Sequence, residues 1–101
     1  MIHVIASIRV KPGCLPRFLE IFKRNVPAVQ AEAGCLAYRP TVDVDAGLAP
    51  QRLEPDTVVI VEQWDSLDAL RCHLAAPHMA AYREQVKDLV AGTSLKVLQD
   101  V

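Results

Sequence analysis

The sequence predicts an α+β fold in which four strands form one antiparallel sheet and helices cover one of its faces. Three observations lead to this prediction. Apolar and polar residues alternate in several short segments, as they do in half-buried strands. Segments with apolar residues at helical spacing lie between them. The chain has 101 residues, 51% of them hydrophobic, which suits one domain spanning residues 1–101.

The first strand is expected over residues 2–11, and the first helix follows a turn at residues 11–13. The strand has two faces, Ile2, Val4, Ala6, Ile8 and Val10 on one and His3, Ile5, Ser7 and Arg9 on the other. The helix carries apolar residues at helical spacing from Leu15 to Val29. Because Pro27 lies inside this pattern, a kink or break is expected near residues 25–26. Gly34 is expected to end the helix.

The second and third strands are expected over residues 35–44 and 57–65. The third strand contains the run Val58-Val59-Ile60-Val61, which is typical of a buried strand. Residues 45–56 carry two prolines and a glycine and are expected to form the connecting loop. This loop is longer than a usual hairpin connection. It is therefore a candidate for a lid, or for an arm that reaches across a dimer.

Two helical segments and a last strand are expected after the third strand. Ser66 is a good N-cap for the first segment. The apolar stripe of that segment is Leu67, Leu70 and Leu74. Pro77 breaks the helix, and a second segment runs over residues 78–91. Its inward residues are Met79, Tyr82, Val86 and Leu89. Gly92 is expected to end this segment before a strand at residues 93–99.

This order of elements, β-α-β-β-α-β, is that of the ferredoxin-like fold, with both helices on one face of the sheet. The opposite face would carry a mixed set of residues that is too apolar for open water. That set is His3, Ile5, Ser7, Val59, Val61 and Gln63. A second copy of the chain is the simplest cover for such a face. We therefore predict a homodimer that pairs sheet on sheet.

Composition argues against several other partners. The 11 basic and 12 acidic residues form no basic stripe, so nucleic acid is not an expected partner. No apolar run approaches the ~20 residues that span a bilayer, and a strand pattern starts at once instead of a signal sequence. A membrane partner is therefore not expected, and the protein is expected to be cytoplasmic. Cys14, Cys35 and Cys72 lack metal-ligand spacing and are expected to be reduced thiols.

The sequence Glu62-Gln63-Trp64, followed by His73, is the main candidate for a catalytic site. Glu62 and Trp64 are two residues apart on a strand and project to the same face. A carboxylate buried beside an indole has a raised pKa unless it is paired, and it can then act as a base near neutral pH. His73, on the next helix, could be oriented by Glu62 and shuttle a proton. The structural alternatives are a backbone-bonded Glu62, a core Trp64 and a packing role for His73.

Four further residues are candidates for the same pocket or its surroundings. Tyr82 lies on the inward side of the last helical segment, where it could hydrogen-bond a substrate oxygen or simply fill the core. Tyr38, on the second strand, could have either of the same two roles. Ala6 leaves space that suits a small apolar pocket. His78 is expected at the surface, at the start of a helix.

Several motifs together resemble the antibiotic biosynthesis monooxygenase domain. They are Lys11-Pro12-Gly13, Glu32-Ala33-Gly34-Cys35-Leu36-Ala37-Tyr38, Glu62-Gln63-Trp64, His73-Leu74 and Pro77-His78. The resemblance covers nearly the whole chain and omits only the loop at residues 45–56. It implies a dimeric α+β barrel built from two ferredoxin-like protomers, with the pocket on the helix side of each sheet.

The resembled family has several activities, including cofactor-free quinol and polyketide monooxygenases, haem-degrading enzymes and an isomerase of a phosphorylated autoinducer. The haem-degrading members pair an asparagine of the first strand with a histidine of the second helix. The corresponding positions here are about Ala6 and Arg83, neither of which can do this. The chain has no Gly-rich phosphate loop, and Arg9 is expected on the other face of the sheet. Few cations are therefore expected at the pocket, which weakens the isomerase interpretation.

We therefore predict a cofactor-independent monooxygenase that acts on a small aromatic substrate, a quinol or polycyclic phenol. His73 with Glu62 would take the phenolic proton, Trp64 would face the ring, and Tyr82 would hold an oxygen. No metal, flavin or haem is assigned. One alternative is a non-catalytic dimeric small-molecule-binding protein, in which Glu62 and His73 are too far apart to hydrogen-bond. Another is an oxygen-independent isomerase on the same scaffold.

Overall fold

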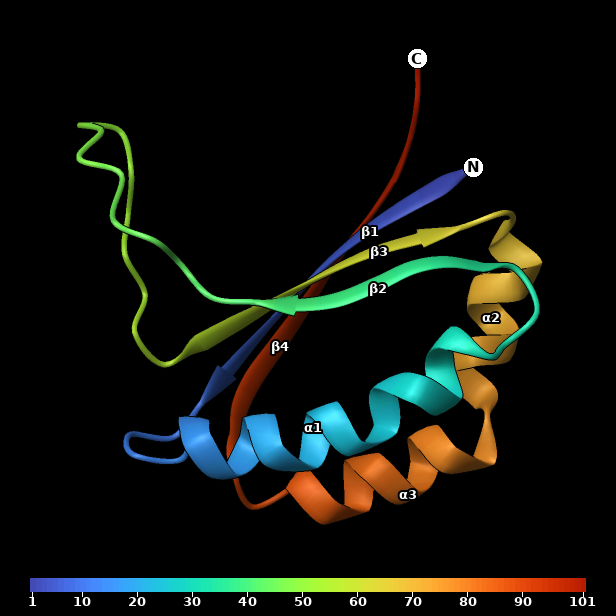
Figure 1. Cartoon of the computed structure of the whole chain (residues 1–101), viewed down its shortest axis with the longest axis horizontal. Coiled ribbons are helices and arrows are strands. Elements are labelled where there is room, and N and C mark those ends of the chain that lie inside the picture. Colours follow the sequence, from blue (N-terminus) through green and yellow to red (C-terminus); the bar gives the residue numbers. More distant parts are fainter.

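The four strands form one antiparallel sheet in the order β2-β3-β1-β4, as the predicted fold requires. This arrangement comes from a computed structural model that describes all residues, 1–101 (Figure 1). The elements along the chain are β1 (Ile2–Val10), α1 (Leu15–Gln30), β2 (Cys35–Thr41), β3 (Thr57–Trp64), α2 (Leu67–Ala75), α3 (Pro77–Val86) and β4 (Val90–Gln99).

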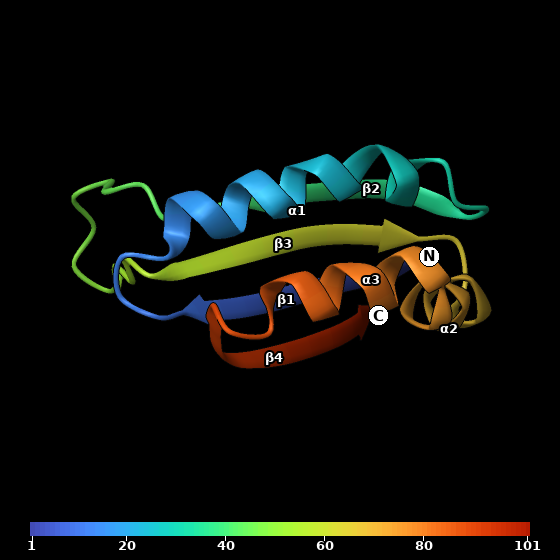
Figure 2. The same cartoon turned by 90° about the horizontal axis from the view of Figure 1, so that it is seen from below.

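The helices lie together on one side of the sheet. Figures 1 and 2 show α1 and α3 side by side across that side, with α2 at the end where β3 stops. A cluster of 17 buried hydrophobic residues joins the helices to the sheet. The other side of the sheet carries no helix, so the protomer has two layers and one open sheet face.

Strand register explains which residues the helices cover. In the pairing of β1 with β3, Val4 lies opposite Glu62 and Ala6 lies opposite Ile60, and all four are buried. Residues between them, such as Val61, point to the open face and keep more exposure. The alternation in the sequence therefore predicted both faces correctly, because side chains along a strand point to opposite sides in turn.

The expected break at Pro27 is wrong, because α1 continues through it to Gln30. Proline has no N–H, and its missing hydrogen bond leaves the carbonyl of Lys23 without its helical partner. Pro27 and Lys23 are both exposed, so water can satisfy that carbonyl. The helix also ends before Gly34, which lies in the following turn with a positive φ of 82°.

The helical segment expected over residues 78–91 is shorter than predicted. The helix α3 ends at Val86, and β4 begins at Val90, which pairs with Val10 of β1. Gly92 therefore lies inside a strand instead of ending a helix. A Cβ at Gly92 would stand 3.1 Å from Nη2 of Arg9, so the missing side chain makes room for that guanidinium.

The apolar stripe predicted for α2 is only partly buried. Ser66 caps this helix as predicted, because its Oγ accepts a hydrogen bond from the N–H of Ala69 at 3.1 Å. Leu70 is buried, but Leu67 and Leu74 are largely exposed. His73 takes an inward place instead, and it is the most buried residue of the helix.

The connection between β2 and β3 covers residues 42–56, because β2 ends at Thr41 instead of the expected residue 44. It projects beyond the end of the sheet (Figure 1). Hydrogen bonds within it include one from the N–H of Glu54 to Oδ2 of Asp43, at 2.7 Å. None of its residues lines the cavity described below. No helix in the structure is both long enough and apolar enough to cross a membrane.

Candidate active site

A cavity of about 520 Å³, here called the inner cavity, lies between the sheet and the helices. Eleven of its 16 lining residues are hydrophobic, which is typical of sites for small organic molecules. Five of the six predicted site residues line it, each from a different element. They are Ala6 of β1, Tyr38 of β2, Glu62 of β3, His73 of α2 and Tyr82 of α3.

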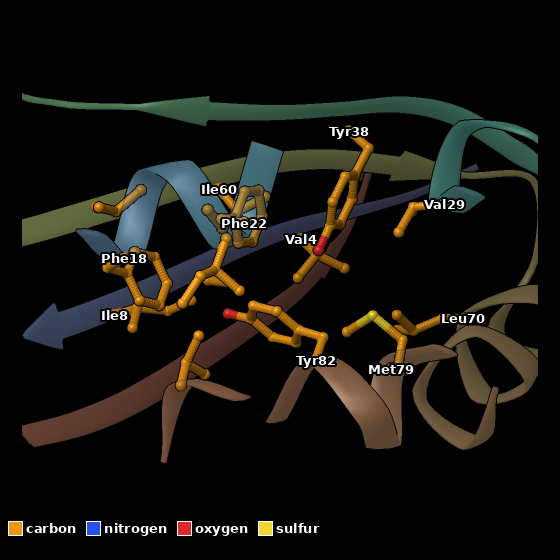
Figure 3. Close-up of a cluster of buried hydrophobic side chains, with 14 of the residues drawn as sticks. Val4, Ile8, Phe18, Phe22, Val29, Tyr38, Ile60, Leu70, Met79 and Tyr82 are labelled. Atoms are coloured by element: carbon orange, nitrogen blue, oxygen red, sulfur yellow. The ribbon is translucent and has the colours of Figure 1, made fainter. Parts of the chain in front are cut away.

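Aromatic rings form one wall of the inner cavity. Phe22 of α1 stacks on Tyr38, with ring centroids 5.5 Å apart, and meets Tyr82 edge to face at 5.6 Å. Figure 3 shows the Tyr38 ring descending from its strand and the Tyr82 ring on the helix facing it. Burial raises the pKa of both tyrosines above the usual value, so each hydroxyl keeps its proton near neutral pH. Both can therefore donate a hydrogen bond to an oxygen in the cavity.

Glu62 is the buried carboxyl group of the inner cavity. It is 5% exposed, and its Oε1 accepts a hydrogen bond from Nε1 of Trp64 at 3.0 Å. Burial raises the pKa of Glu62 to about 7, although the bond from Trp64 opposes this rise; the nearby Glu32 carboxylate adds to it. The predicted raised pKa is therefore confirmed in direction, and Glu62 can exchange a proton near neutral pH.

Trp64 lies behind the site and does not line the inner cavity. Its indole is fully buried, and its ring centroid is 4.6 Å from that of His73. The indole therefore contacts both ionisable groups of the site: it donates to Glu62 and packs against His73. Its predicted contact with a substrate ring stays a prediction.

The expected hydrogen bond between His73 and Glu62 is not formed. Nδ1 of His73 instead bonds to Oε2 of Glu32 at 2.8 Å. Glu32 lies in the turn after α1, and this turn brings its carboxylate to the end of α2. A carboxylate accepts only, so Nδ1 carries the hydrogen, and in the neutral ring Nε2 keeps its lone pair. Burial lowers the pKa of His73 despite Glu32, so the neutral ring predominates at neutral pH.

Three functional candidates were missed or misplaced by the sequence. Glu32 was noticed only as part of a family-like motif. His78 was expected to be a surface residue, but its Nε2 bonds to Glu32 at 2.7 Å. Arg83 and Lys87 are the two cations among the 16 residues that line the inner cavity, and Arg9 is not among them, as expected. The signal for Glu32 and His78 was their presence in two of the quoted motifs. Arg83 was marked only through the resemblance, as the position of a histidine in the haem-degrading members, because the direction of a helical side chain depends on how the helix packs.

Comparison with known proteins identifies the family. The family described as "Antibiotic biosynthesis monooxygenase" matches residues 1–85 of the chain. The chain therefore belongs to the antibiotic biosynthesis monooxygenase family, as its motifs indicated.

Individual relatives agree with this assignment. The chain is 45% identical over 101 residues to the "Probable quinol monooxygenase YgiN" of Escherichia coli (strain K12), covering 98% of this chain and 97% of that protein. The structure of Rv0793 from Mycobacterium tuberculosis is 25% identical, with a TM-score of 0.81 over 99% of this chain and 94% of that one. PA3566 from Pseudomonas aeruginosa is 24% identical, with a TM-score of 0.82 over 99% and 93%. At 24% identity, the similarity to PA3566 shows a shared fold alone.

Proposed function

We propose that this protein is a cofactor-independent monooxygenase that oxidises a quinol or polycyclic phenol. The observation that carries the proposal is a neutral histidine, His73, held by the carboxylate of Glu32 at the wall of an apolar cavity. A base oriented by a carboxylate is suited to abstracting a proton from a phenol. The name of the Escherichia coli relative, a quinol monooxygenase, supports the same reaction class.

In the proposed reaction, Nε2 of His73 takes a phenolic proton and leaves an electron-rich quinolate. The quinolate passes one electron to dioxygen, and the two radicals combine to form a carbon–oxygen bond. Cleavage of the O–O bond of the resulting peroxide releases water, which receives the proton back from the site. The balance is quinol plus dioxygen to hydroxyquinone plus water. The substrate supplies all the electrons, so the proposal assigns no cofactor.

The other cavity residues have supporting roles in this proposal. Glu62 is the second proton-exchanging group, suited to protonating the reduced oxygen. The hydroxyls of Tyr82 and Tyr38 hold substrate oxygens, and Ala6 leaves space for the ring. Arg83, whose positive charge acts on both His73 and Tyr82, stabilises the quinolate as it forms. Trp64 is assigned to hold Glu62 and His73 in place.

We also propose that two protomers pair through the open sheet face. The support is that this face carries apolar side chains with no cover in the protomer, such as the 38% exposed Val61. Buried apolar contact is the main source of stability in protein association. The 42–56 loop lies away from the inner cavity of its own protomer, so it is better suited to reach a partner than to act as a lid on its own site.

A second candidate function is a non-catalytic small-molecule-binding protein. It is favoured by one observation, namely that Glu62 and His73 bond to Trp64 and Glu32 and not to each other. An oxygen-independent isomerase would use the same base. The three functions differ in what they consume: the first needs dioxygen, the isomerase does not, and the binding protein turns nothing over.

The test is oxygen uptake by the purified protein with a panel of naphthohydroquinones and anthrone-like phenols, with autoxidation subtracted. His73→Ala should lower kcat by roughly 100-fold or more, the usual contribution of a general base. Glu62→Gln tests the second proton group. Arg71→Ala, an exposed change on the same helix, is the matched control and should keep wild-type activity.

The outcomes separate the candidates. Enzyme-dependent uptake that is lost in His73→Ala and kept in Arg71→Ala supports the monooxygenase. Conversion of a substrate at the same rate without oxygen favours the isomerase. Quenching of Trp64 fluorescence by the same compounds, without any turnover, favours the binding protein.

A further inference from the structure

Glu32 connects two histidines that come from different helices. Its Oε2 bonds to Nδ1 of His73 at the end of α2, and its Oε1 bonds to Nε2 of His78 at the start of α3, at 2.8 and 2.7 Å. Each carboxylate oxygen therefore has one imidazole partner. The Glu32 side chain as a whole is 17% exposed, so most of its surface is covered by protein.

The two histidines lie on different sides of the cavity wall. His73 lines the inner cavity, whereas Glu32 and His78 do not. These two line a separate open depression of about 780 Å³ on the outside, here called the outer depression, which His73 also borders. His78 therefore has no access to a molecule in the inner cavity. It shares its partner Glu32 with His73, which lines that cavity.

The tautomer of His78 follows from its contacts. Nε2 faces a carboxylate oxygen, which accepts only, so Nε2 carries a hydrogen. Nδ1 is buried and has no hydrogen-bond partner. A buried N–H without a partner is costly, whereas a buried lone pair on an unprotonated nitrogen costs less. The contacts therefore favour a hydrogen on Nε2, from which His78 donates one hydrogen bond to Glu32.

We propose that His78 is a positioning residue for the base: from outside the inner cavity it holds Glu32, and through Glu32 it fixes the ring of His73. This proposal rests on the function proposed above. It gives a chemical role to a residue that touches neither substrate nor reacting atoms. Glu32 is anchored by His78 on one oxygen and aims its other oxygen at Nδ1 of His73.

This arrangement matters most when His73 has accepted a proton. The imidazolium is then paired with the Glu32 carboxylate, whose other oxygen is held by the hydrogen bond from Nε2 of His78. The other groups around His73 cannot replace this partner. The charges of His78 and Arg83 both lower the pKa of His73 and so oppose the imidazolium, and Tyr38 and Trp64 contact the ring only by their aromatic faces or edges.

The kinetic test compares His78→Ala with His78→Gln in the full-length protein. The side-chain amide of glutamine can donate from about the position of Nε2 but does not titrate. We expect His78→Ala to lower kcat by roughly 10- to 100-fold with little change in KM, as for partners that orient catalytic groups. The pH profile of kcat should also shift. His78→Gln should restore most of the activity and the wild-type profile. Cys72→Ser, on the same outer depression, is the control.

A second measurement needs no turnover. In ¹⁵N-labelled protein, NMR should show Nδ1 of His73 protonated and Nε2 unprotonated near neutral pH. His78→Ala should give a mixture of tautomers, and His78→Gln should give the wild-type pattern. An unchanged His73 pattern and pH profile in a folded His78→Ala would overturn the proposal, and so would a folded His78→Gln that behaves like the alanine variant. If no quinol is oxidised by the wild type, the proposed function fails, but the NMR comparison still decides the role of His78.

Discussion

The two faces of β3 differ in burial and in the residues they carry. Val58, Ile60, Glu62 and Trp64 point toward the helices and are all buried. Their neighbours Val59, Val61 and Gln63 point to the open face and are half-buried or exposed. The inner face supplies core, cavity wall and an ionisable group at once, while the open face supplies only a surface. Alternation along a single strand thus separates the face proposed for catalysis from the face proposed for association.

The largest expected effect concerns the carboxyl group of the inner face. The pKa of Glu62 in the folded chain, about 7, lies above its ordinary value of 4.5, so the folded chain binds this proton more tightly. The contribution of Glu62 to the free energy of unfolding should therefore be fully present below pH 4.5 and should be lost as pH rises through 7. Glu62→Gln removes this loss and keeps an acceptor for Trp64. At pH 8 it should be more stable than wild type by about 3 kcal/mol.

Urea unfolding at several pH values measures this difference. The two proteins should be nearly equal at pH 4.5 and should diverge above it. Glu54→Gln, which changes an exposed carboxyl group in the 42–56 loop, is the control and should follow wild type at every pH. Parallel curves for wild type and Glu62→Gln would mean that Glu62 ionises as freely as a surface residue.

A matched pair of valines tests the packing difference between the faces. Val58 is fully buried, whereas its neighbour Val59 is only partly buried on the open face. Val58→Ala should lower the free energy of unfolding by about 2 kcal/mol, through lost burial and an added void. Val59→Ala should cost less than about 1 kcal/mol. Both changes are measured by chemical denaturation in the Val61→Lys background described below, so that pairing of the open faces does not contribute. Equal losses there would contradict the assigned difference in burial within the protomer.

A charge placed on the open face should change the stability of the protomer least of all these variants. It should, however, change the oligomeric state. Val61→Lys should change the stability of the protomer by about 0.5 kcal/mol or less, because the side chain is exposed there. Pairing two such faces would bury lysines against each other, so the variant should be monomeric in sedimentation equilibrium while wild type is dimeric. Leu67→Lys, an exposed leucine of α2, is the control. A dimeric Val61→Lys would place the interface elsewhere.

Local periodicity predicted the strands and their faces but not every boundary. The alternation of β1 and β3 placed Ala6 and Glu62 on the helix side correctly. The end of α3 was placed too late, because residues 90–92 also pair with β1, and a helical pattern does not reveal that competition. Pro27 misled for a related reason: the cost of an interior proline depends on whether the freed carbonyl reaches water.

The candidate site divides in the same way. Its residue types and the strand face of Glu62 follow from the sequence by itself, because the direction of a side chain on a strand depends on local backbone geometry. The hydrogen-bond partners of the site residues do not follow from the sequence. Glu32 and His73 are 41 positions apart, and they meet because the turn after α1 and the end of α2 lie at the same end of the sheet. Which carboxylate orients the histidine was therefore decided by tertiary packing, since a hydrogen bond depends on distance in space and no local pattern encodes that distance.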